Sequence, residues 1–370
     1  MEEKEGMNKE EYRQELSNIT TILLDESSYP GQLLESCNEM HGLLSGISGV
    51  GGEDYEVSTD KEDLMLSSGK AISTWSAGRC IIEFSRTAKY LRGLHDAISD
   101  MLKSEKERPL RILYAGCGPY ATLALPLMEK FSPDQLQFTL LEINEVSLES
   151  AKTLIKSFEY DDFVSDYHLC DATSYHHPTG RPFHIIITET MLRALEIEPQ
   201  AAITLNLADQ LCEGGIFIPQ RIVIDTALVD MAKEFTFYPA GSEIPQEDID
   251  NPGRNRRRQF FGRLLDFTAS SALEIREKVT SDSSGQPHFP PITLKIPSHI
   301  EPGLDMLLLL TNIEIYGHHF MGDYESSITN SLQLTERKKV ESWSEIEFTY
   351  VIGKKPGFQQ CIVKENNCDH

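Results

Sequence analysis

The clearest chemical signal in the sequence is a glycine-rich turn, Gly116-Cys117-Gly118, which follows the apolar run 110–115. Because glycine lacks a Cβ atom, its backbone can approach a ligand closely and adopt dihedral angles that other residues avoid. The spacing after the turn predicts a helix that starts near Ala121, whose first N–H groups would be free to bind a ligand. A turn of this kind, at the first strand-to-helix junction of an open parallel sheet, is a ligand-binding position.

Polar residues stand at the ends of the next apolar runs. Glu142 lies 24 residues beyond Gly118, and an acidic residue at that position can accept hydrogen bonds from both hydroxyls of a ribose. Asn144 follows two residues later, and we predict that it lines the same pocket. Asp171 and Ala172 come directly after a weaker apolar run.

Two glutamates, Glu189 and Glu198, flank a short segment after the apolar run 183–188. Two carboxylates can hold a guanidinium by bidentate hydrogen bonds, and a carboxylate can orient or deprotonate a nucleophile. We therefore interpret both glutamates as candidate catalytic residues. The sequence has no H-x-x-H, H-E-x-x-H or C-x-x-C pattern, so we predict no metal site.

The elements that must position these residues alternate along the chain. Apolar runs predict strands at 110–115, 137–142, 167–170, 183–188 and 217–225. Helices are predicted between them, at 147–158 and 199–211 besides the one near Ala121. This alternation is typical of an α/β fold with a parallel sheet covered on both faces. The stretches 1–65 and 70–104 have helical spacing, and period-two stretches after residue 225 predict antiparallel hairpins.

We therefore expect three parts in the chain. They are a helical N-terminal extension or lid at 1–105, a Rossmann-like ligand-binding domain at 106–225 and an antiparallel β domain at 226–365. The extension contains Ser73, Trp75, Arg79 and Arg86, which could face the pocket.

The glycine-rich turn, Glu142 and the Asp171-Ala172 pair, in this order, resemble the motifs of the class I S-adenosylmethionine (SAM)-dependent methyltransferase superfamily. The resemblance implies that Gly116, Cys117 and Gly118 contact the methionine part of SAM. It implies further that Glu142 binds the ribose and that Asp171 with Ala172 contacts the adenine amino group. SAM is thus the expected cofactor, and an arginine of the extension could pair with its carboxylate.

A narrower resemblance concerns Glu189, Met191 and Glu198. Protein arginine methyltransferases carry two glutamates nine residues apart at this point, with a methionine two residues after the first, and a β domain follows. The resemblance covers roughly residues 110–365. The Trp and Gly usually found in that loop are absent here, since Thr190 and Leu192 stand beside Met191. By the same analogy, the β domain could pair two copies of the chain as a homodimer.

The predicted site residues are compatible with three functions. The leading prediction is a SAM-dependent methyltransferase that acts on a small amine-bearing metabolite, with an arginine methyltransferase-like enzyme as a narrower form. The second is an enzyme that transfers or cyclises the aminocarboxypropyl arm of SAM and releases methylthioadenosine, since the N-terminal extension is similar in outline to the helical caps of azetidine-carboxylate synthases. The third is a protein that binds SAM without catalysis.

Composition excludes some partners. The net charge is -24, and residues 1–65 hold 16 Asp and Glu against 4 Lys and Arg, so we expect no nucleic-acid partner, which would need clustered cations. The one basic run, 254–258, is predicted to be a solvated loop or helix end. Seven widely spaced cysteines, an acidic N-terminus and no apolar run of about 18 residues predict a cytoplasmic protein without a membrane partner.

Overall fold

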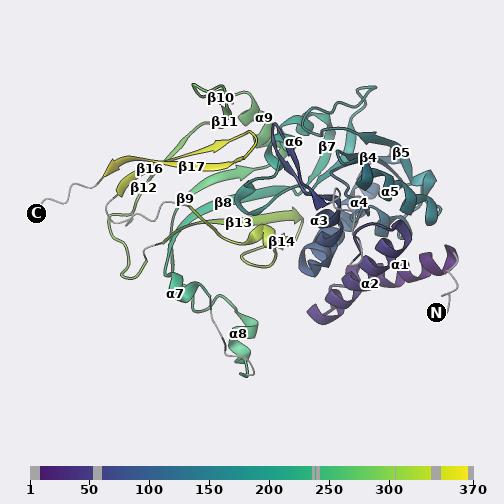
Figure 1. Ribbon diagram of the computed structural model, residues 1–370, viewed down its shortest axis with the longest axis horizontal. Helices are drawn as coiled ribbons and strands as arrows, with labels where there is room; N and C mark the ends of the chain where they lie inside the picture. The colour runs from purple at the N-terminus through teal and green to yellow at the C-terminus, as the bar shows by residue number, and fades with distance from the viewer. Residues whose placement is uncertain are drawn as a thin grey trace, which may run out of the picture.

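The computed structural model describes residues 9–52, 61–235, 238, 242–304, 306–334 and 343–365. Helices of the N-terminal part and a parallel sheet form one end of the molecule, and antiparallel strands extend away from them (Figure 1). The predicted fold class is confirmed: an α/β parallel sheet carries a helical N-terminal extension and is followed by antiparallel β structure.

The parallel sheet has the strand order β5-β4-β3-β6-β7. Its strands are β3 Leu110–Ala115, β4 Leu136–Glu142, β5 Val164–Leu169, β6 Phe183–Thr188 and β7 Leu211–Ile218. Every neighbouring pair is parallel. The chain leaves β3 on one side toward β4 and later returns to its other side as β6, so the gap between β3 and β6 is the topological switch point at which open sheets of this kind bind ligands.

The predicted strand at 217–225 is wrong, because two strands occupy that segment. β7 ends at Ile218, and β8 Arg221–Val229 starts a different, antiparallel sheet. Pro219 stands between them, and proline has no N–H to donate to a sheet ladder. The chain therefore passes from the parallel sheet to the antiparallel sheet at a residue that has no backbone N–H to donate.

The predicted helix near Ala121 is also wrong. The segment forms turns and a short 3-10 helix, η3 Leu125–Glu129. Pro126 in this segment lacks an N–H and would clash with the carbonyl four residues before it in an α-helix. The glycine-rich turn is therefore not followed by a regular helix N-terminus. The other predicted helices of this part are present as α5 Glu145–Ser157 and α6 Gln200–Leu207, which η6 Ala208–Gln210 extends.

The N-terminal extension contains more than helices. It comprises α1 Lys9–Leu24, α2 Pro30–Ser48, the hairpin β1 Leu64–Leu66 and β2 Gly69–Ala71, α3 Thr74–Arg79, η2 Cys80–Ile82 and α4 Phe84–Ser104. The single helix predicted over 70–104 is thus interrupted before α4. Apolar residues of α4 recur every three or four positions, so one face of the helix is buried in the core.

The antiparallel part consists of two sheets. One has the order β14-β13-β8-β9 with β15 beside β13, and the other has the order β10-β11-β16-β12 with β17 beside β16. The strands of the first sheet are β9 Arg258–Phe267, β13 Met306–Tyr316, β14 His319–Met321 and β15 Leu332–Gln333. Those of the second are β10 Thr280–Ser281, β11 Pro287–His288, β12 Ile292–Lys295, β16 Trp343–Val351 and β17 Gly357–Glu365.

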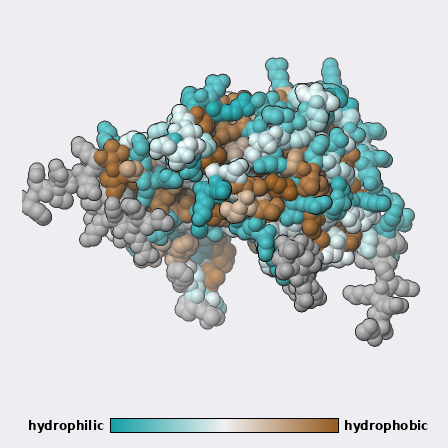
Figure 2. All heavy atoms as spheres, turned by 45° about the horizontal axis from the view of Figure 1, so that its top comes forward, coloured by the Kyte–Doolittle hydropathy of each residue, from teal (hydrophilic) through white to brown (hydrophobic). Residues whose placement is uncertain are grey.

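Short helices complete this part. α9 Ala269–Arg276 packs against α6, and η7 Ser327–Thr329 lies between β14 and β15. α7 Met231–Glu234 and α8 Gln246–Asp250 project from the sheets (Figure 1). Within the described ranges, no helix is long and apolar enough to cross a bilayer, and Figure 2 shows a face on which hydrophilic residues surround smaller hydrophobic areas.

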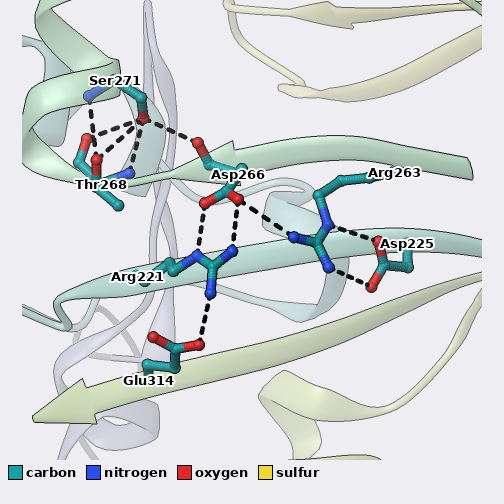
Figure 3. Close-up of polar contacts among 7 residues, drawn as sticks. All are labelled: Arg221, Asp225, Arg263, Asp266, Thr268, Ser271 and Glu314. Carbon is teal, nitrogen blue, oxygen red and sulfur yellow. Dashed lines mark hydrogen bonds and ion pairs between the residues drawn. The ribbon is translucent and has the colours of Figure 1, made fainter. Parts of the chain in front are cut away.

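A ladder of ion pairs crosses β8, β9 and β13 (Figure 3). Arg221 donates to both carboxylate oxygens of Asp266, each at 2.6 Å, and to Glu314 at 2.8 Å. Arg263 donates to Asp225 at 2.9 Å and to Asp266 at 3.2 Å. These side chains are partly exposed, so water and salt weaken the pairs. The ladder fixes which residues face each other across three strands and adds little stability.

The basic run 254–258 begins in an exposed turn, as predicted, but Arg258 at its end belongs to β9, and its side chain is only 9% exposed and is paired. Its guanidinium contacts Glu234, whose side chain is completely buried, and Asp323. The Tyr324 hydroxyl also donates to Glu234, at 2.6 Å. A buried carboxylate remains ionised only with such partners, and these contacts hold the pKa of Glu234 below its usual value although burial acts against them.

The two kinds of ion pair should differ in their effect on stability. Removing one partner of a buried pair leaves an uncompensated charge, so we expect Glu234→Gln to lower the free energy of unfolding by about 3 kcal/mol. Glu314→Gln removes one exposed rung of the ladder and should cost about 0–1 kcal/mol. Urea unfolding of both variants measures the difference. Equal losses would contradict this assignment of buried and exposed pairs.

Candidate functional site

One cavity lies at the carboxyl edge of the parallel sheet, and residues that follow four of its strands line it. The space inside it, including solvent at the mouth, is about 1050 Å³. Parallel strands end at the same edge, so residues directly after them meet there. Eight of the nine predicted site residues line the cavity: Gly116, Cys117, Gly118, Glu142, Asp171, Ala172, Glu189 and Glu198.

Asn144 is the exception, since the structure does not place it among the lining residues. Its side-chain oxygen accepts hydrogen bonds from the N–H groups of Val146 and Ser147, at 3.0 and 3.3 Å. Asn144 is thus the N-cap of α5, a role for which asparagine is favoured. It acts on the site indirectly, by fixing the start of the helix behind Glu142.

The turn after β3 needs both of its glycines. Gly116 and Gly118 have φ values of 73° and 66°, in the left-handed region that other residues avoid. A Cβ atom on Gly116 would lie 2.5 Å from the methyl group of Thr190. The close approach packs the end of β3 against the residue that follows Glu189.

Glu142 is bound to the turn by its carboxylate. One oxygen accepts hydrogen bonds from the N–H groups of Ile143 and Asn144 at 2.9 and 3.0 Å, and the other accepts from Gly118 N–H at 2.8 Å. Burial raises the pKa of Glu142, although these three hydrogen bonds act in the opposite direction. An ionised carboxylate has about four acceptor positions, so three backbone donors leave room for a ligand hydroxyl.

Asp171 occupies the corresponding place after β5. Its Oδ1 atom accepts hydrogen bonds from the N–H and hydroxyl of Thr173, at 2.8 and 2.7 Å. The side chain is therefore held by the turn that follows it. Cys170, Asp171 and Ala172 together line the cavity on this side.

Arg86 is the buried cation at the cavity, where Lys70 is also a lining residue. Of the four residues of the extension that were predicted to face the pocket, only Arg86 lines it; Arg79 lies over the Trp75 ring instead. The Nη1 atom of Arg86 is 3.6 Å from Glu189 Oε2, and the Nη2 atom of Arg86 donates to the Cys80 carbonyl at 3.0 Å. Burial alone would lower the pKa of Arg86, but the Glu189 carboxylate keeps it above its usual value.

The segment between Glu189 and Glu198 has an unusual backbone. Ala194, Leu195 and Ile197 have φ values of 51°, 56° and 70°, and a positive φ is a clear outlier for a β-branched residue such as isoleucine. Each such residue costs about 1–3 kcal/mol and persists only where its surroundings hold it. The strain identifies this loop as a constrained part of the site.

The antiparallel sheets and the β1–β2 hairpin supply those constraints. The N–H of Ala194 donates to the Thr311 hydroxyl at 2.8 Å, and the Tyr350 hydroxyl donates to the Leu195 carbonyl at 2.8 Å. Ile197 donates to the Pro356 carbonyl at 2.9 Å and accepts from Lys70 N–H at 2.8 Å. These long-range contacts place Glu198, and no local sequence pattern predicts them.

Gln200 joins the two ends of the same loop. Its side-chain oxygen accepts a hydrogen bond from Thr190 N–H at 2.9 Å, and its own N–H donates to the Thr190 carbonyl at 3.1 Å. Gln200 is completely buried. The residue after Glu189 is therefore bound to the second residue after Glu198, which brings both glutamates to one side of the cavity.

Burial raises the pKa of both glutamates. The pKa of Glu189 is raised to about 7, mainly by burial, with Arg86 acting against the rise. The pKa of Glu198 is also raised to about 7, by burial and by the nearby charge of Glu189. Carboxylates that titrate near neutral pH can accept or release protons in catalysis.

Tyr90 is a lining residue that the sequence did not single out as chemical. It lies on α4, one turn beyond Arg86, and its side chain is 1% exposed. Among the described residues, its hydroxyl has no hydrogen-bond partner. A buried hydroxyl without a partner costs free energy, so Tyr90 is a candidate for contact with a bound ligand.

Comparisons with known proteins add two structures of similar layout. A chain of the Trypanosoma brucei PRMT1 enzyme–prozyme heterotetrameric complex with AdoHcy has a TM-score of 0.44 and 12% sequence identity, covering 77% of this chain and 92% of that one. PRMT6 has a TM-score of 0.44 and 9% identity, covering 74% of this chain and 96% of that one. No protein-family model matches the sequence, and no curated protein sequence is significantly similar to it. At these identities and TM-scores, the residues of this chain must carry the functional assignment.

Glu198 should make stability depend on pH. Its pKa is raised to about 7 in the folded protein from the usual 4.5 of an exposed glutamate, so between these values the folded protein keeps a proton that the unfolded chain has lost. Stability therefore falls as pH rises through this window. Glu198→Gln has no such proton, and we expect its Tm relative to the wild type to rise between pH 5 and pH 7.5.

Thermal unfolding at several pH values measures this difference. Glu213→Gln, which replaces an exposed glutamate, is the control and should show no pH-dependent change in Tm relative to the wild type. A difference between Glu198→Gln and the wild type that stays constant over this range would show that Glu198 ionises as freely as an exposed residue.

Proposed function

We propose that the cavity binds SAM and that the protein is a SAM-dependent methyltransferase whose acceptor is a small amine-bearing metabolite. The observation that carries this proposal is the meeting of four segments around one cavity: the glycine-rich turn, Glu142, Asp171-Ala172 and the Glu189–Glu198 loop. The sheet topology brings the four segments together at one edge, and each carries residue types that can bind a part of SAM.

The charges of the cavity suit this cofactor. Four acids, Glu142, Asp171, Glu189 and Glu198, line the cavity together with Arg86 and Lys70. Arg86 is the buried one of the two cations and lies beside Glu189. SAM carries a sulfonium, an ammonium and a carboxylate, so it is a net cation with one anionic group. Carboxylates can stabilise the two positive groups, and Arg86 can pair with the negative one.

The geometry of the turn disfavours a dinucleotide. In dinucleotide-binding sheets, the pyrophosphate sits on free N–H groups of the glycine-rich turn and of the helix after it. Here the N–H of Gly118 donates to the Glu142 carboxylate, and no regular helix starts after the turn. A pyrophosphate would meet a carboxylate where it needs a donor, whereas a ribose hydroxyl would meet an acceptor.

The reaction would be an in-line displacement. When bound, SAM supplies a methyl group on a positively charged sulfur, which the acceptor nitrogen attacks while the C–S bond electrons pass to the sulfur. Glu189 and Glu198 would bind the acceptor amine, orient its lone pair and take up the proton that nitrogen releases. Arg86 would hold Glu189 in place on the side opposite the acceptor.

The N-terminal extension contributes to the wall of the cavity, which favours a small acceptor. Lys70, Ala71, Ile72, Ala77 and Ile81, all from the extension before the sheet, contribute to the lining. The same wall supports the second candidate function, in which the amino-acid arm of SAM reacts and no second substrate is needed. The arginine methyltransferase-like form stays a further alternative, because two carboxylates can also hold a guanidinium.

The wider assignments also remain proposals. A net charge of -24 supports a protein without a nucleic-acid partner. We further propose a cytoplasmic protein that pairs as a homodimer through its antiparallel β structure.

Products formed from SAM distinguish the first two functions. We expect the purified protein to leave SAM intact when incubated alone, and to form S-adenosylhomocysteine once an amine-containing metabolite extract is added. Mass spectrometry follows both products. Methylthioadenosine formed from SAM alone would replace methyl transfer with cleavage or cyclisation of the arm.

Gly116→Ala should weaken SAM binding about tenfold or more, equivalent to about 1.4 kcal/mol, because the added methyl group would collide with Thr190 and disturb the turn. Gly214→Ala is a matched control, since Gly214 has a similar φ of 72° but open space around its Cβ position. Calorimetric titration with SAM compares the two variants. If Gly116→Ala binds SAM as tightly as Gly214→Ala does, the turn does not contact the cofactor.

Glu189→Gln should spare SAM binding but lower kcat, because glutamine cannot accept the proton. With both glutamates titrating near pH 7, the wild-type rate should rise with pH through this region as the pair ionises. Measuring kcat from pH 5.5 to 8.5 tests the assignment. A flat profile, or full activity of Glu189→Gln, would remove Glu189 from the chemistry.

A further inference from the structure

A second cluster of ligand-type side chains lies outside the cavity, where three distant segments meet. Glu26 is in the loop between α1 and α2, Asp96 is on α4, and His318 and His319 form the end of the β13–β14 turn. The segments are separated by about 70 and 220 residues, so the fold alone brings them together.

The imidazoles of both histidines point to the same carboxylate oxygen. His318 Nε2 lies 2.8 Å from Glu26 Oε1, and His319 Nε2 lies 3.9 Å from that oxygen. His319 Nε2 is also 2.8 Å from Asp96 Oδ2. One ligand atom from each of Glu26, His318 and His319 lies within 4.8 Å of the other two.

We propose that Glu26, His318 and His319 form a zinc site, with a water molecule as the fourth ligand. Imidazole nitrogens and carboxylate oxygens are ordinary zinc ligands, and tetrahedral ligands at about 2.0–2.1 Å from the metal are roughly 3.3 Å apart. The distances from Glu26 Oε1 to His318 Nε2, 2.8 Å, and to His319 Nε2, 3.9 Å, lie on either side of that value. Two imidazoles disfavour Ca²⁺ and Mg²⁺, which take oxygen ligands.

The surroundings prepare the ligands for a cation. The His319 side chain is 6% exposed and therefore held in place, and His95 Nδ1 lies 3.1 Å from the second oxygen of Asp96. Arg92 donates to the backbone carbonyls of Leu23 and Asp25 at 2.8 and 2.6 Å.

A metal ion at this place would join the N-terminal helices to the rest of the protein. Its ligands come from the α1–α2 loop and from the β13–β14 turn. Helix α4, whose Asp96 lies 2.8 Å from His319, packs against both α1 and β14. The first turns of α4 carry Arg86 and Tyr90, which line the cavity. Zinc would thus stabilise the helix from which the cavity takes its only arginine among the described lining residues.

Zinc binding by the untagged full chain, stripped of metal with a chelator, tests the site. Calorimetric titration with zinc chloride should show about one ion per chain, and zinc should raise the Tm because it binds the folded form. Glu26→Gln and His318→Gln alter exposed side chains and should each weaken binding about 10-fold or more. His299→Gln removes another exposed histidine outside the cluster and should bind zinc as the wild type does.

Two results would overturn the proposal. Either the wild type takes up no zinc, or Glu26→Gln and His318→Gln both bind it as tightly as His299→Gln does. Calcium or magnesium raising the Tm as much as zinc does would also contradict the assignment of the ion. None of these readouts involves SAM, so the zinc site and the proposed function stand or fall separately.

Discussion

The ion pair between Arg86 and Glu189 joins the two halves of the site. Arg86 comes from α4, in the helical extension, and Glu189 follows β6 of the parallel sheet. Both side chains are largely buried, and a buried charge without a partner would be costly. The pair therefore requires α4 to lie over the carboxyl edge of the sheet, and the cavity is the space that this position encloses.

The strained loop between the glutamates explains why antiparallel sheets accompany the parallel one. Positive φ values at Ala194, Leu195 and Ile197 are unfavourable in isolation. Contacts from Thr311 and Tyr350, on β13 and β16, hold the loop in that conformation. The antiparallel sheets thus position Glu198, and a parallel sheet alone would leave it on an unsupported loop.

Much of the fold could be predicted from the sequence because its signals are local. β3 and β6 have the predicted bounds, since continuous apolar runs between polar residues define buried parallel strands. The secondary-structure predictions failed where a single residue or a distant contact determines the local structure. Pro126 prevents the helix near Ala121, and Pro219 separates β7 from β8 where one continuous strand was predicted.

The site residues also fall into those that local spacing predicts and those that only the tertiary structure brings together. Glu142 and Asp171 stand at strand ends, so the sheet topology places them and their spacing reveals them. Asn144 has a suitable residue type, but its side chain caps α5. Arg86 contacts Glu189 about 100 positions along the chain, and Glu26 contacts His318 about 290 positions along it. No local sequence pattern predicts contacts between residues so far apart.

The central claim is that the cavity is built for a sulfonium nucleoside rather than for a pyrophosphate. Calorimetric titration of the wild-type protein with SAM and, separately, with NAD⁺ tests it most directly. The account predicts that SAM binds at one molecule per chain and that NAD⁺ produces no binding heat. Binding of NAD⁺ in preference to SAM would contradict the role of the Glu142–Gly118 contact and with it the assignment of the site.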